Sequence, residues 1–137
     1  MEQRWTFIVE WGDCDAAGIV FYPNYYRWFD AGFQKLLRLA GTSQRELAGR
    51  YGIIGTGLVD TGARFKGPAA CGDEIELVTR IGSFEATTFT ASHTVFKHGR
   101  AIVEGFEKRA FLAPGNGDGR LKVLPVPADF RALFTPA

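Results

Sequence analysis

Two aspartates, Asp13 and Asp15, lie in a turn of small residues just before a helix that Pro23 is suited to open. A carboxylate can activate water or attack a carbonyl carbon. The first N–H groups of a helix have no partners within it and carry partial positive charge, so they can polarise a carbonyl oxygen. Residues 16–18, two alanines and a glycine, leave room for a substrate. The turn is therefore a candidate site, with the alternative that both aspartates only bind nearby backbone N–H groups.

No other motif in the sequence offers comparable chemistry. Cys14 lies between two carboxylates, which disfavour the thiolate that a reactive cysteine needs. His93 falls within a strand pattern, where we expect a packed or hydrogen-bonded side chain, and His98 stands at a turn. Cys71 is far from both, so zinc-ligand spacing does not occur, and there is no G-x-S-x-G motif. Residues 55–57 (Gly-Thr-Gly) match no nucleotide-binding fingerprint and indicate a bend before a strand. We expect neither a metal nor a cofactor.

Length and composition predict one ordinary soluble domain. The 137 residues suffice for a core and are few enough that an oligomer is a reasonable expectation. A formal net charge of +1 argues against a nucleic-acid-binding protein, which would carry a basic stripe. No apolar run approaches the ~18 residues that span a membrane, and residues 2–4 interrupt any signal peptide. With two cysteines and no export signal, we expect a cytoplasmic protein with reduced thiols.

A long helix is predicted from Pro23 to about Gly41. Proline suits the first helical position, and glycine is a suitable end. Apolar residues recur at helical spacing along it, namely Phe29, Phe33, Leu36, Leu37 and Ala40. Gly32 costs this helix about 1 kcal/mol of propensity. A helix pressed closely against a sheet would explain that glycine.

The rest of the chain predicts short helices and an antiparallel sheet. Ser43–Glu46 has the spacing of a capping box, so a short helix should run to about Gly52, and another is expected near residues 129–134. Alternation predicts a first strand with inward Trp5, Phe7, Val9 and Trp11. Further strands are expected at residues 58–66, 74–81, 87–95 and 102–109. In the last of these one face carries Val103, Gly105, Glu107 and Arg109. Late strands joined by short turns, with 114–119 as a loop, indicate an α+β fold.

Basic residues occur in modest pairs along the sequence. The pairs are Arg64 with Lys66, Lys97 with Arg100, Lys108 with Arg109, and Arg120 with Lys122. We interpret each pair first as part of a solvated charged face. The alternative is a rim that holds the phosphates of a substrate through charge-assisted hydrogen bonds.

Residues 12–30 read Gly-Asp-Cys-Asp-Ala-Ala-Gly-Ile-Val-Phe-Tyr-Pro-Asn-Tyr-Tyr-Arg-Trp-Phe-Asp. This segment closely resembles the signature of the hot-dog-fold acyl-CoA thioesterases, and most of all the 4-hydroxybenzoyl-CoA thioesterase branch. The likeness continues through residues 52–56, 63–65 and 72–75, so it covers most of the chain. It implies a single hot-dog domain spanning residues 1–137, in which a curved antiparallel sheet of about five strands wraps a long central helix.

The resemblance also implies roles for individual residues. Asp15 matches the catalytic carboxylate, acting as nucleophile or as base for water, and the Tyr22 backbone N–H matches the donor to the thioester carbonyl. Asp30 and Thr56 match positions that contact the hydroxyl of a hydroxybenzoyl group, and Tyr25 is expected to form a pocket wall. A thioester leaves as a thiolate whose conjugate thiol has a pKa near ~8.5, so neither a histidine nor a metal is required.

Coenzyme A and further copies of the chain are the partners that the resemblance implies. The candidates for holding CoA are Arg64, Lys66, Lys97 and Arg100. Family members form homodimers that pair into homotetramers, with active sites at subunit interfaces. Tyr26 departs from the family pattern, where histidine is frequent, and this leaves the acyl group open. The alternatives are a thioesterase for short aliphatic acyl-CoA or acyl-carrier-protein substrates, and a non-catalytic acyl-CoA-binding module.

Overall fold

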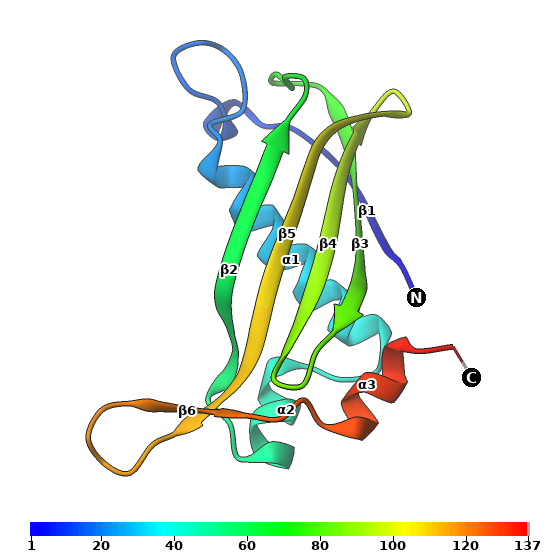
Figure 1. The fold of residues 1–137 in the computed structure, drawn as a ribbon. Helices are drawn as coiled ribbons and strands as arrows, with labels where there is room; N and C mark the ends of the chain where they lie inside the picture. Colours follow the sequence, from blue (N-terminus) through cyan, green and yellow to red (C-terminus); the bar gives the residue numbers. More distant parts are fainter. Residues whose placement is uncertain (137) are drawn as a thin grey trace.

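The computed structural model describes residues 1–136, and Figure 1 shows one long helix running along a face of a sheet. The strands are β1 (Gln3–Ile8), β2 (Gly55–Phe65), β3 (Glu74–Phe84), β4 (Thr88–Lys97), β5 (Arg100–Pro114) and β6 (Leu121–Leu124). The helices are α1 (Pro23–Leu39), α2 (Gln44–Tyr51) and α3 (Ala128–Phe134), with a 3-10 turn η1 (Trp11–Asp13). The strand order is β1-β3-β4-β5-β2, β6 pairs with β5, and every pairing is antiparallel. In the described part of the chain, no helix is long and apolar enough to cross a membrane.

Helix α1 begins and ends as predicted. Pro23 is its first residue, and Gly41 adopts a φ of +87° just beyond its end. The side of α1 that faces the sheet buries Tyr25, Trp28, Phe29, Phe33, Leu36 and Leu37. Gly32 lies where the helix closely approaches the sheet, since a Cβ there would be 2.7 Å from Oγ1 of Thr79. The expectation that this glycine permits close packing is confirmed.

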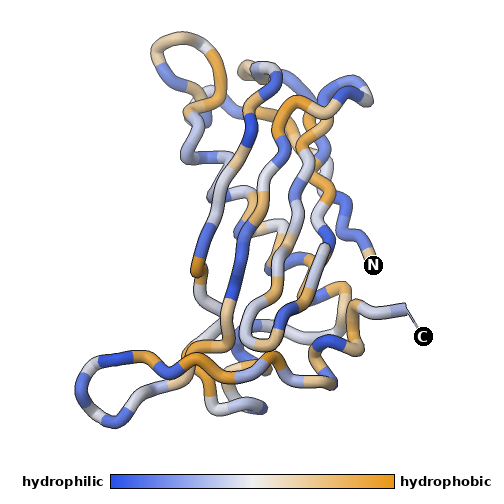
Figure 2. The backbone as a smooth tube through the Cα atoms, viewed as in Figure 1, coloured by the Kyte–Doolittle hydropathy of each residue, from blue (hydrophilic) through white to orange (hydrophobic). Residues whose placement is uncertain are grey.

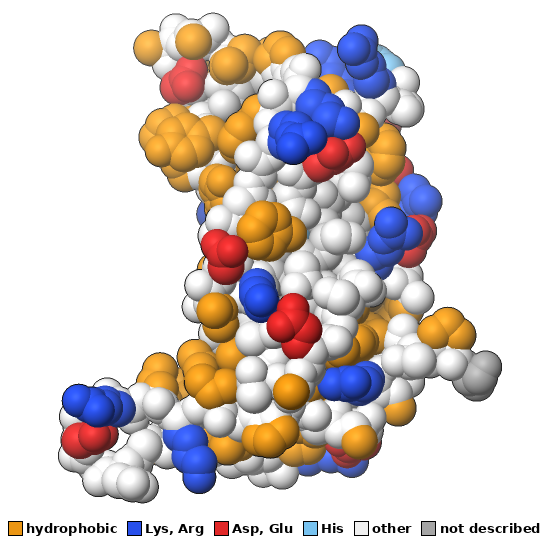
Figure 3. All heavy atoms as spheres, viewed as in Figure 1, with side chains coloured by type: hydrophobic (Ala, Val, Ile, Leu, Met, Phe, Trp, Pro, Cys, Tyr) orange, Lys and Arg blue, Asp and Glu red, His pale blue; other side chains and the backbone are white. Residues whose placement is uncertain are grey.

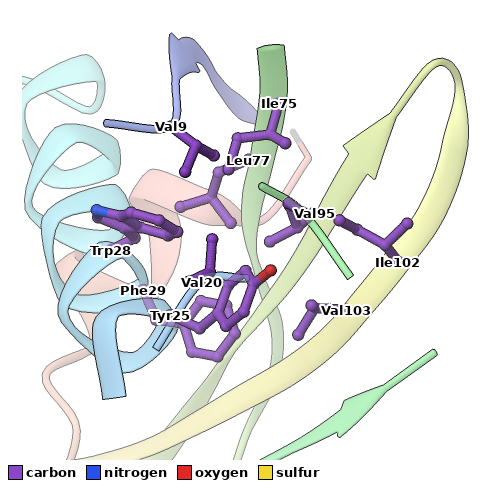
Figure 4. Close-up of a cluster of buried hydrophobic side chains, with 11 residues drawn as sticks. Val9, Val20, Tyr25, Trp28, Phe29, Ile75, Leu77, Val95, Ile102 and Val103 are labelled. Carbon is purple, nitrogen blue, oxygen red and sulfur yellow. The ribbon is translucent and has the colours of Figure 1, made fainter. Parts of the chain in front are cut away.

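Two apolar clusters fill the space between α1 and the sheet. The cluster under the first half of α1 includes Val9, Val20, Trp28, Phe29, Leu77 and Val103 (Figure 4). The cluster beside α2 and α3 includes Phe33, Leu47, Phe89, Phe111 and Phe130. In Figure 2 hydrophobic and hydrophilic positions intermix along the strands, as a sheet with one covered face requires. Both halves of α1 are therefore fixed to the sheet, and the segment before the helix has a rigid support.

The short elements largely follow the sequence prediction. Oγ of Ser43 accepts the N–H of Glu46 (3.2 Å), and Gly52 ends α2 in the left-handed conformation. His98 and Gly99 both have positive φ and form the tight turn between β4 and β5. Helix α3 appears where the short C-terminal helix was expected. The α+β class is thus confirmed, with six strands in the described residues rather than about five.

Three details of the prediction are wrong. The first strand ends at Ile8, and Trp11 is 84% exposed in η1 instead of facing inward. Strand β2 begins at Gly55, so residues 55–57 are no bend; they pair with 110–112, and a Cβ on Gly57 would collide with the Leu112 side chain. Strand β6 was missed because four residues are too few to show a periodicity.

Candidate active site

The chain from Cys14 to Val20 doubles back on itself just before α1. These two residues form an antiparallel bridge, and within the turn Asp15 N–H donates to the Ile19 carbonyl (3.0 Å). The Gly18 N–H donates a hydrogen bond to the Asp15 carbonyl oxygen (2.9 Å). The φ of Gly18 is +82°, which glycine adopts at no steric cost. The turn therefore carries Asp15 on a hydrogen-bonded loop of defined shape.

Asp13 holds this turn against the start of α1. Its Oδ2 accepts the N–H of Glu10 (2.8 Å), and its Oδ1 accepts from Nη2 of Arg27 (3.3 Å). Its carbonyl oxygen accepts from Asn24 Nδ2 and from the Phe21 N–H, both at 2.8 Å. Both side-chain oxygens of Asp13 are thus engaged in support of the local fold.

Asp15, in contrast, is exposed and only partly engaged. Its Oδ1 accepts the Ala17 N–H (2.9 Å), whereas within residues 1–136 no donor contacts Oδ2. The side chain borders a hollow of about 430 Å³ whose other lining residues are Trp11, Cys14, Ala16, Gly18 and Cys71. The space that the small residues were expected to leave beside Asp15 is present. Geometry therefore separates the two aspartates, which sequence spacing alone did not.

Cys14 has a packing role. Its sulfur lies 3.7 Å from the Glu10 carbonyl oxygen, and the side chain packs against the first apolar cluster. Cys71 borders the same hollow, so the fold brings together two cysteines that are distant in sequence. Across the described residues, no group of three or more His, Cys, Asp and Glu side chains could hold a metal ion.

The start of α1 offers fewer free N–H groups than expected. The Asn24 N–H donates to the Phe21 carbonyl (2.9 Å), the Tyr25 N–H donates to the Tyr22 carbonyl (3.1 Å), and Pro23 has no N–H. The expected row of free donors is therefore wrong, because the first turn closes with tight i→i+3 bonds. The N–H of Tyr22, just before the helix, has no acceptor in the part of the chain that the structure describes.

Tyr22 and Tyr25 line a second hollow, which has no lining residue in common with the first. It measures about 360 Å³ and is bordered by Ile19, Val20, Tyr22, Tyr25, Phe65, Lys66, Gly67, Pro68 and Ala69. Tyr25 is 3% exposed and meets the Trp28 ring edge-on with centroids 5.3 Å apart. Burial, together with the nearby Cys14 and Asp73, raises the Tyr25 pKa to about 12, so its hydroxyl stays protonated. Tyr25 thus lines this hollow, and its role as a wall of the substrate pocket stays a prediction.

Residues 69–73, just before β3, form hydrogen bonds that hold the acidic turn in place. Ala70 bridges to Ile19, and the Val20 N–H donates to the Ala69 carbonyl (2.9 Å). Asp73 Oδ2 accepts from the Ala70 N–H and from Lys97 Nζ, both at 2.8 Å. The hydrogen bond from Lys97 is the main reason why the pKa of Asp73 is lowered. Lys97 therefore has a structural partner in this conformation.

Asp30 and Thr56 come together through a residue that the prediction did not assign to the site. Arg109 donates from Nη2 to Oδ1 of Asp30 and from Nη1 to the Thr56 carbonyl, both at 2.8 Å. Gln44 forms two hydrogen bonds with Thr56: its Nε2 donates to Thr56 Oγ1 (2.6 Å), and its Oε1 accepts the Thr56 N–H (3.0 Å). A hollow of about 250 Å³ at this place is lined in part by Gln34, Gln44, Thr56 and Arg109.

A buried polar chain continues from Arg109 across the sheet. Arg109 Nη2 also donates to Glu107 Oε2 (2.7 Å), and Glu107 Oε1 lies 2.8 Å from His93 Nε2. The Nδ1 of His93 lies 2.8 Å from Thr79 Oγ1, and its ring stacks on Phe29 at 4.7 Å. The expectation of a hydrogen-bonded His93 is confirmed. The chain joins β3, β4 and β5 to α1, between the two apolar clusters.

The four candidates for holding CoA form two pairs of neighbours: Lys97 and Arg100 are directly opposite each other in the pairing of β4 with β5, and Arg64 and Lys66 both lie beside Glu104. Lys66 lines the hollow at Tyr22 and also pairs with Glu104 (2.7 Å). Arg64 borders a different, shallow hollow on the sheet, and Arg100 is exposed at the start of β5. Lys97 is also paired with Asp73, and the role of these four cations in holding CoA stays a prediction.

Two residues of the polar chain escaped sequence reasoning. Arg109 was assigned with Lys108 to a solvated pair, which is wrong because the Arg109 side chain is only 5% exposed. Glu107 is placed by the sequence on one face of a strand but without a role in the site, and its side chain is 2% exposed. The available signal was the alternation in β5, since both residues share a face with Val103, which is fully buried.

Comparison with known proteins shows the family of the chain. The family model described as Thioesterase-like superfamily matches residues 9–134. The 4-hydroxybenzoyl-CoA thioesterase of Pseudomonas sp. (strain CBS-3) is 34% identical over 139 residues, covering 97% of this chain and 94% of that protein.

Solved structures extend the likeness to three dimensions. An aspartate-to-asparagine mutant of 4-hydroxybenzoyl-CoA thioesterase, complexed with 4-hydroxybenzoyl-CoA, has a TM-score of 0.87 at 31% identity, covering 98% of this chain and 99% of that chain. A gentisyl-coenzyme A thioesterase has a TM-score of 0.82 at 35% identity, covering 96% of this chain and 99% of that chain. The architecture of a long helix on an antiparallel sheet is the hot-dog fold of these proteins. On sequence and structure alike, the chain belongs to the thioesterase-like superfamily.

Proposed function

We propose that this protein hydrolyses an aromatic acyl-CoA thioester to the free acid and CoA. The observation that carries the proposal is a partly unengaged carboxylate, Asp15, on a rigid turn that leads directly into a helix start with an available N–H at Tyr22. Membership in the thioesterase-like superfamily supports the reaction class. The relatives named for 4-hydroxybenzoyl-CoA and gentisyl-coenzyme A support an aromatic acyl group.

In the proposed reaction the Tyr22 N–H donates to the thioester carbonyl oxygen and stabilises the negative charge that forms there. Asp15 either attacks the carbonyl carbon or takes a proton from the attacking water. The carbon–sulfur bond then breaks, and CoA leaves as a thiolate that needs no strong general acid. Water supplies the oxygen of the carboxylic acid. Asp30 and Thr56 would bind a hydroxyl on the acyl group, at the far end from the reacting carbonyl.

We propose that two copies of the chain build each site. Phe65, at the end of β2, packs against Tyr22 with ring centroids 6.5 Å apart, whereas Thr56 lies at the other end of that strand. Nine residues at about 3.3 Å each separate these ends by roughly 30 Å, and Asp30 lies about 12 Å along α1 from Tyr22. One benzoyl group cannot bridge such spans within one chain.

The free edge of β2 offers the means to join two copies. It is eleven residues long, lies at the end of the strand order, and exposes Leu58 and Val59 by more than half. Hydrophobic side chains line this edge of the molecule in Figure 3. A twofold pairing of identical strands is antiparallel, so it would place the Tyr22 end of one copy beside the Thr56 end of the other. Two such dimers could associate further into a homotetramer.

The aromatic assignment can be tested with a panel of acyl-CoA substrates. We expect kcat/KM for hydroxybenzoyl-CoA thioesters to exceed that for acetyl-, butyryl- and hexanoyl-CoA by at least ~100-fold, because only the former match a polar end wall behind an apolar pocket. Release of the CoA thiol is followed by its reaction with a disulfide dye. A preference for an aliphatic substrate would contradict the aromatic assignment, and binding of the whole panel without thiol release would indicate a non-catalytic module.

Introducing a charge at the β2 edge tests the shared site. Val59→Glu places two like charges together across the proposed twofold axis, so we expect a monomer with little activity, whereas the wild type should run as a dimer or tetramer. Light scattering coupled to gel filtration gives the masses. The matched control is Val123→Glu, which makes the same change at an exposed position of β6. A monomeric wild type with full activity would refute the two-copy site.

A further inference from the structure

We propose that Arg109 is a positioning residue that sets the preference of this enzyme for acyl groups carrying a hydroxyl. The inference rests on the proposed hydrolysis of aromatic acyl-CoA and adds to it the means by which the polar end of the pocket is held. Arg109 borders the hollow beside Thr56, but its side chain is only 5% exposed and its end nitrogens already donate to protein groups, so it would not itself bind the hydroxyl. It would act through Asp30 and Thr56, which belong to different elements and have no hydrogen bond to one another.

The two end nitrogens of the Arg109 guanidinium donate to three acceptors on three elements, while its buried Nε has no partner within residues 1–136. The guanidinium binds Oδ1 of Asp30 on α1, the Thr56 carbonyl on β2, and Oε2 of Glu107 on its own strand, at 2.7 to 2.8 Å. Its carbon lies 4.4 Å from the centre of the Phe33 ring, which packs against one face of the guanidinium. A planar fork can satisfy several acceptors in fixed directions, which the single ammonium of lysine cannot do.

The contacts leave one acceptor and one donor available at the pocket end. Asp30 Oδ1 accepts from Arg109 and from Gln34 Nε2 (3.2 Å), while no donor within residues 1–136 contacts Oδ2. Thr56 Oγ1 accepts from Gln44, so its own hydrogen remains available to donate. A hydroxyl group donates one hydrogen bond and accepts another. The pair therefore complements a phenolic hydroxyl, with Asp30 as acceptor and Thr56 as donor.

The position of Arg109 is in turn fixed by buried residues of β3, β4 and β5. Glu107 holds Arg109 from within the core and is itself held by His93, whose other nitrogen contacts Thr79. Thr79 and His93 are directly opposite each other in the pairing of β3 with β4. The buried chain thus aims the guanidinium without approaching the substrate, and it fixes Asp30 and Thr56 before any substrate binds.

The test is the selectivity between 4-hydroxybenzoyl-CoA and benzoyl-CoA, measured as the ratio of their kcat/KM values. We expect the wild type to favour the hydroxylated substrate by at least ~100-fold, since a site built for a hydroxyl leaves polar groups unpaired when the hydroxyl is missing. Arg109→Lys should lower this ratio about tenfold or more, chiefly by raising KM for the hydroxylated substrate. Arg80→Lys, the same change at an exposed position of β3, should leave the ratio at the wild-type value.

A purely structural role would lower both rates together, so an unchanged ratio in folded Arg109→Lys overturns the inference. If that variant does not fold, Asp30→Asn carries the test. In this variant the amide oxygen can keep the hydrogen bond from Arg109, while the amide nitrogen replaces the free acceptor Oδ2 with a donor. We therefore expect the kcat/KM ratio to fall close to 1. An unchanged ratio again overturns the inference. A wild type that hydrolyses both aromatic substrates equally refutes this inference but leaves the proposed function intact. A wild type that hydrolyses neither refutes the proposed function itself.

Discussion

Replacing Asp15 with asparagine is expected to lower thioester hydrolysis by at least ~100-fold while leaving the fold intact, the scale of losing a central catalytic group. Asparagine keeps the size of the side chain, and its oxygen can still accept the Ala17 N–H that aspartate accepts now. The side chain is exposed, so no buried packing is lost. What disappears is the negative charge that would attack the carbonyl or activate water. Initial rates of thiol release and the thermal midpoint measure the two effects separately.

Asp13→Asn is the matched control for this experiment. The substitution makes the same chemical change two residues away from Asp15. Both carboxylate oxygens of Asp13, however, already accept hydrogen bonds, one from Glu10 and one from Arg27. We expect this variant to lose some thermal stability and to keep its rate within a few fold. If Asp13→Asn were the inactive variant and Asp15→Asn the active one, the assignment of the two aspartates would be reversed.

Removing the carboxylate of Glu107 should cause the largest loss of stability. Its side chain is 2% exposed and accepts from Arg109 while facing Nε2 of His93. Glu107→Ala would leave a buried arginine and a buried histidine without their shared acceptor. The expected cost is about 3–5 kcal/mol of unfolding free energy, which is typical when one partner of a buried ion pair is removed. Urea unfolding followed by circular dichroism gives the value.

Glu104→Ala provides the comparison on the same strand. Glu104 lies on the opposite side of β5, where it is exposed and pairs with Lys66 at the surface. Its removal should hardly move the unfolding midpoint. Equal midpoints for the two variants would show that the buried chain contributes nothing to the stability of the fold.

Local chemistry in the sequence was enough to predict the elements that position the site. Pro23 and Gly41 mark the ends of α1 because each has a backbone preference that suits only that end. Gly32 indicated the close approach to the sheet, which the structure places at Thr79. Alternation likewise predicted β3 and β4 and the turn at residues 98–99.

The failures have a common physical origin in tertiary contacts. Trp11 fits the alternation of β1 by residue type, but the chain leaves the sheet before reaching it. Residues 55–57 look like a bend because of their two glycines, but they pair with residues 110–112 of β5, and the Leu112 side chain fills the space that a Cβ on Gly57 would need. Neither the end of β1 at Ile8 nor the contact of Leu112 with Gly57 can be recognised from the neighbouring residues in the sequence.

The candidate site shows the same division. The turn and the helix start are local in sequence, so Asp15 and Tyr22 could be named from residues 12–30 and their family resemblance. Arg109 meets Asp30 across 79 positions and Thr56 across 53. A basic residue next to Lys108 looks solvated in sequence, and only the packing of α1 on β5 reveals its buried contacts.

The measurement that tests the central claim most directly is thiol release from 4-hydroxybenzoyl-CoA by the purified wild-type protein, with Asp15→Asn alongside. The account predicts wild-type turnover on the order of 1 s⁻¹ or faster, as is usual for an enzyme on its own substrate class. It also predicts that the variant releases thiol at least ~100-fold more slowly under the same conditions. Wild-type release no faster than that of Asp15→Asn would contradict the claim that this turn and helix start form the site of thioester hydrolysis.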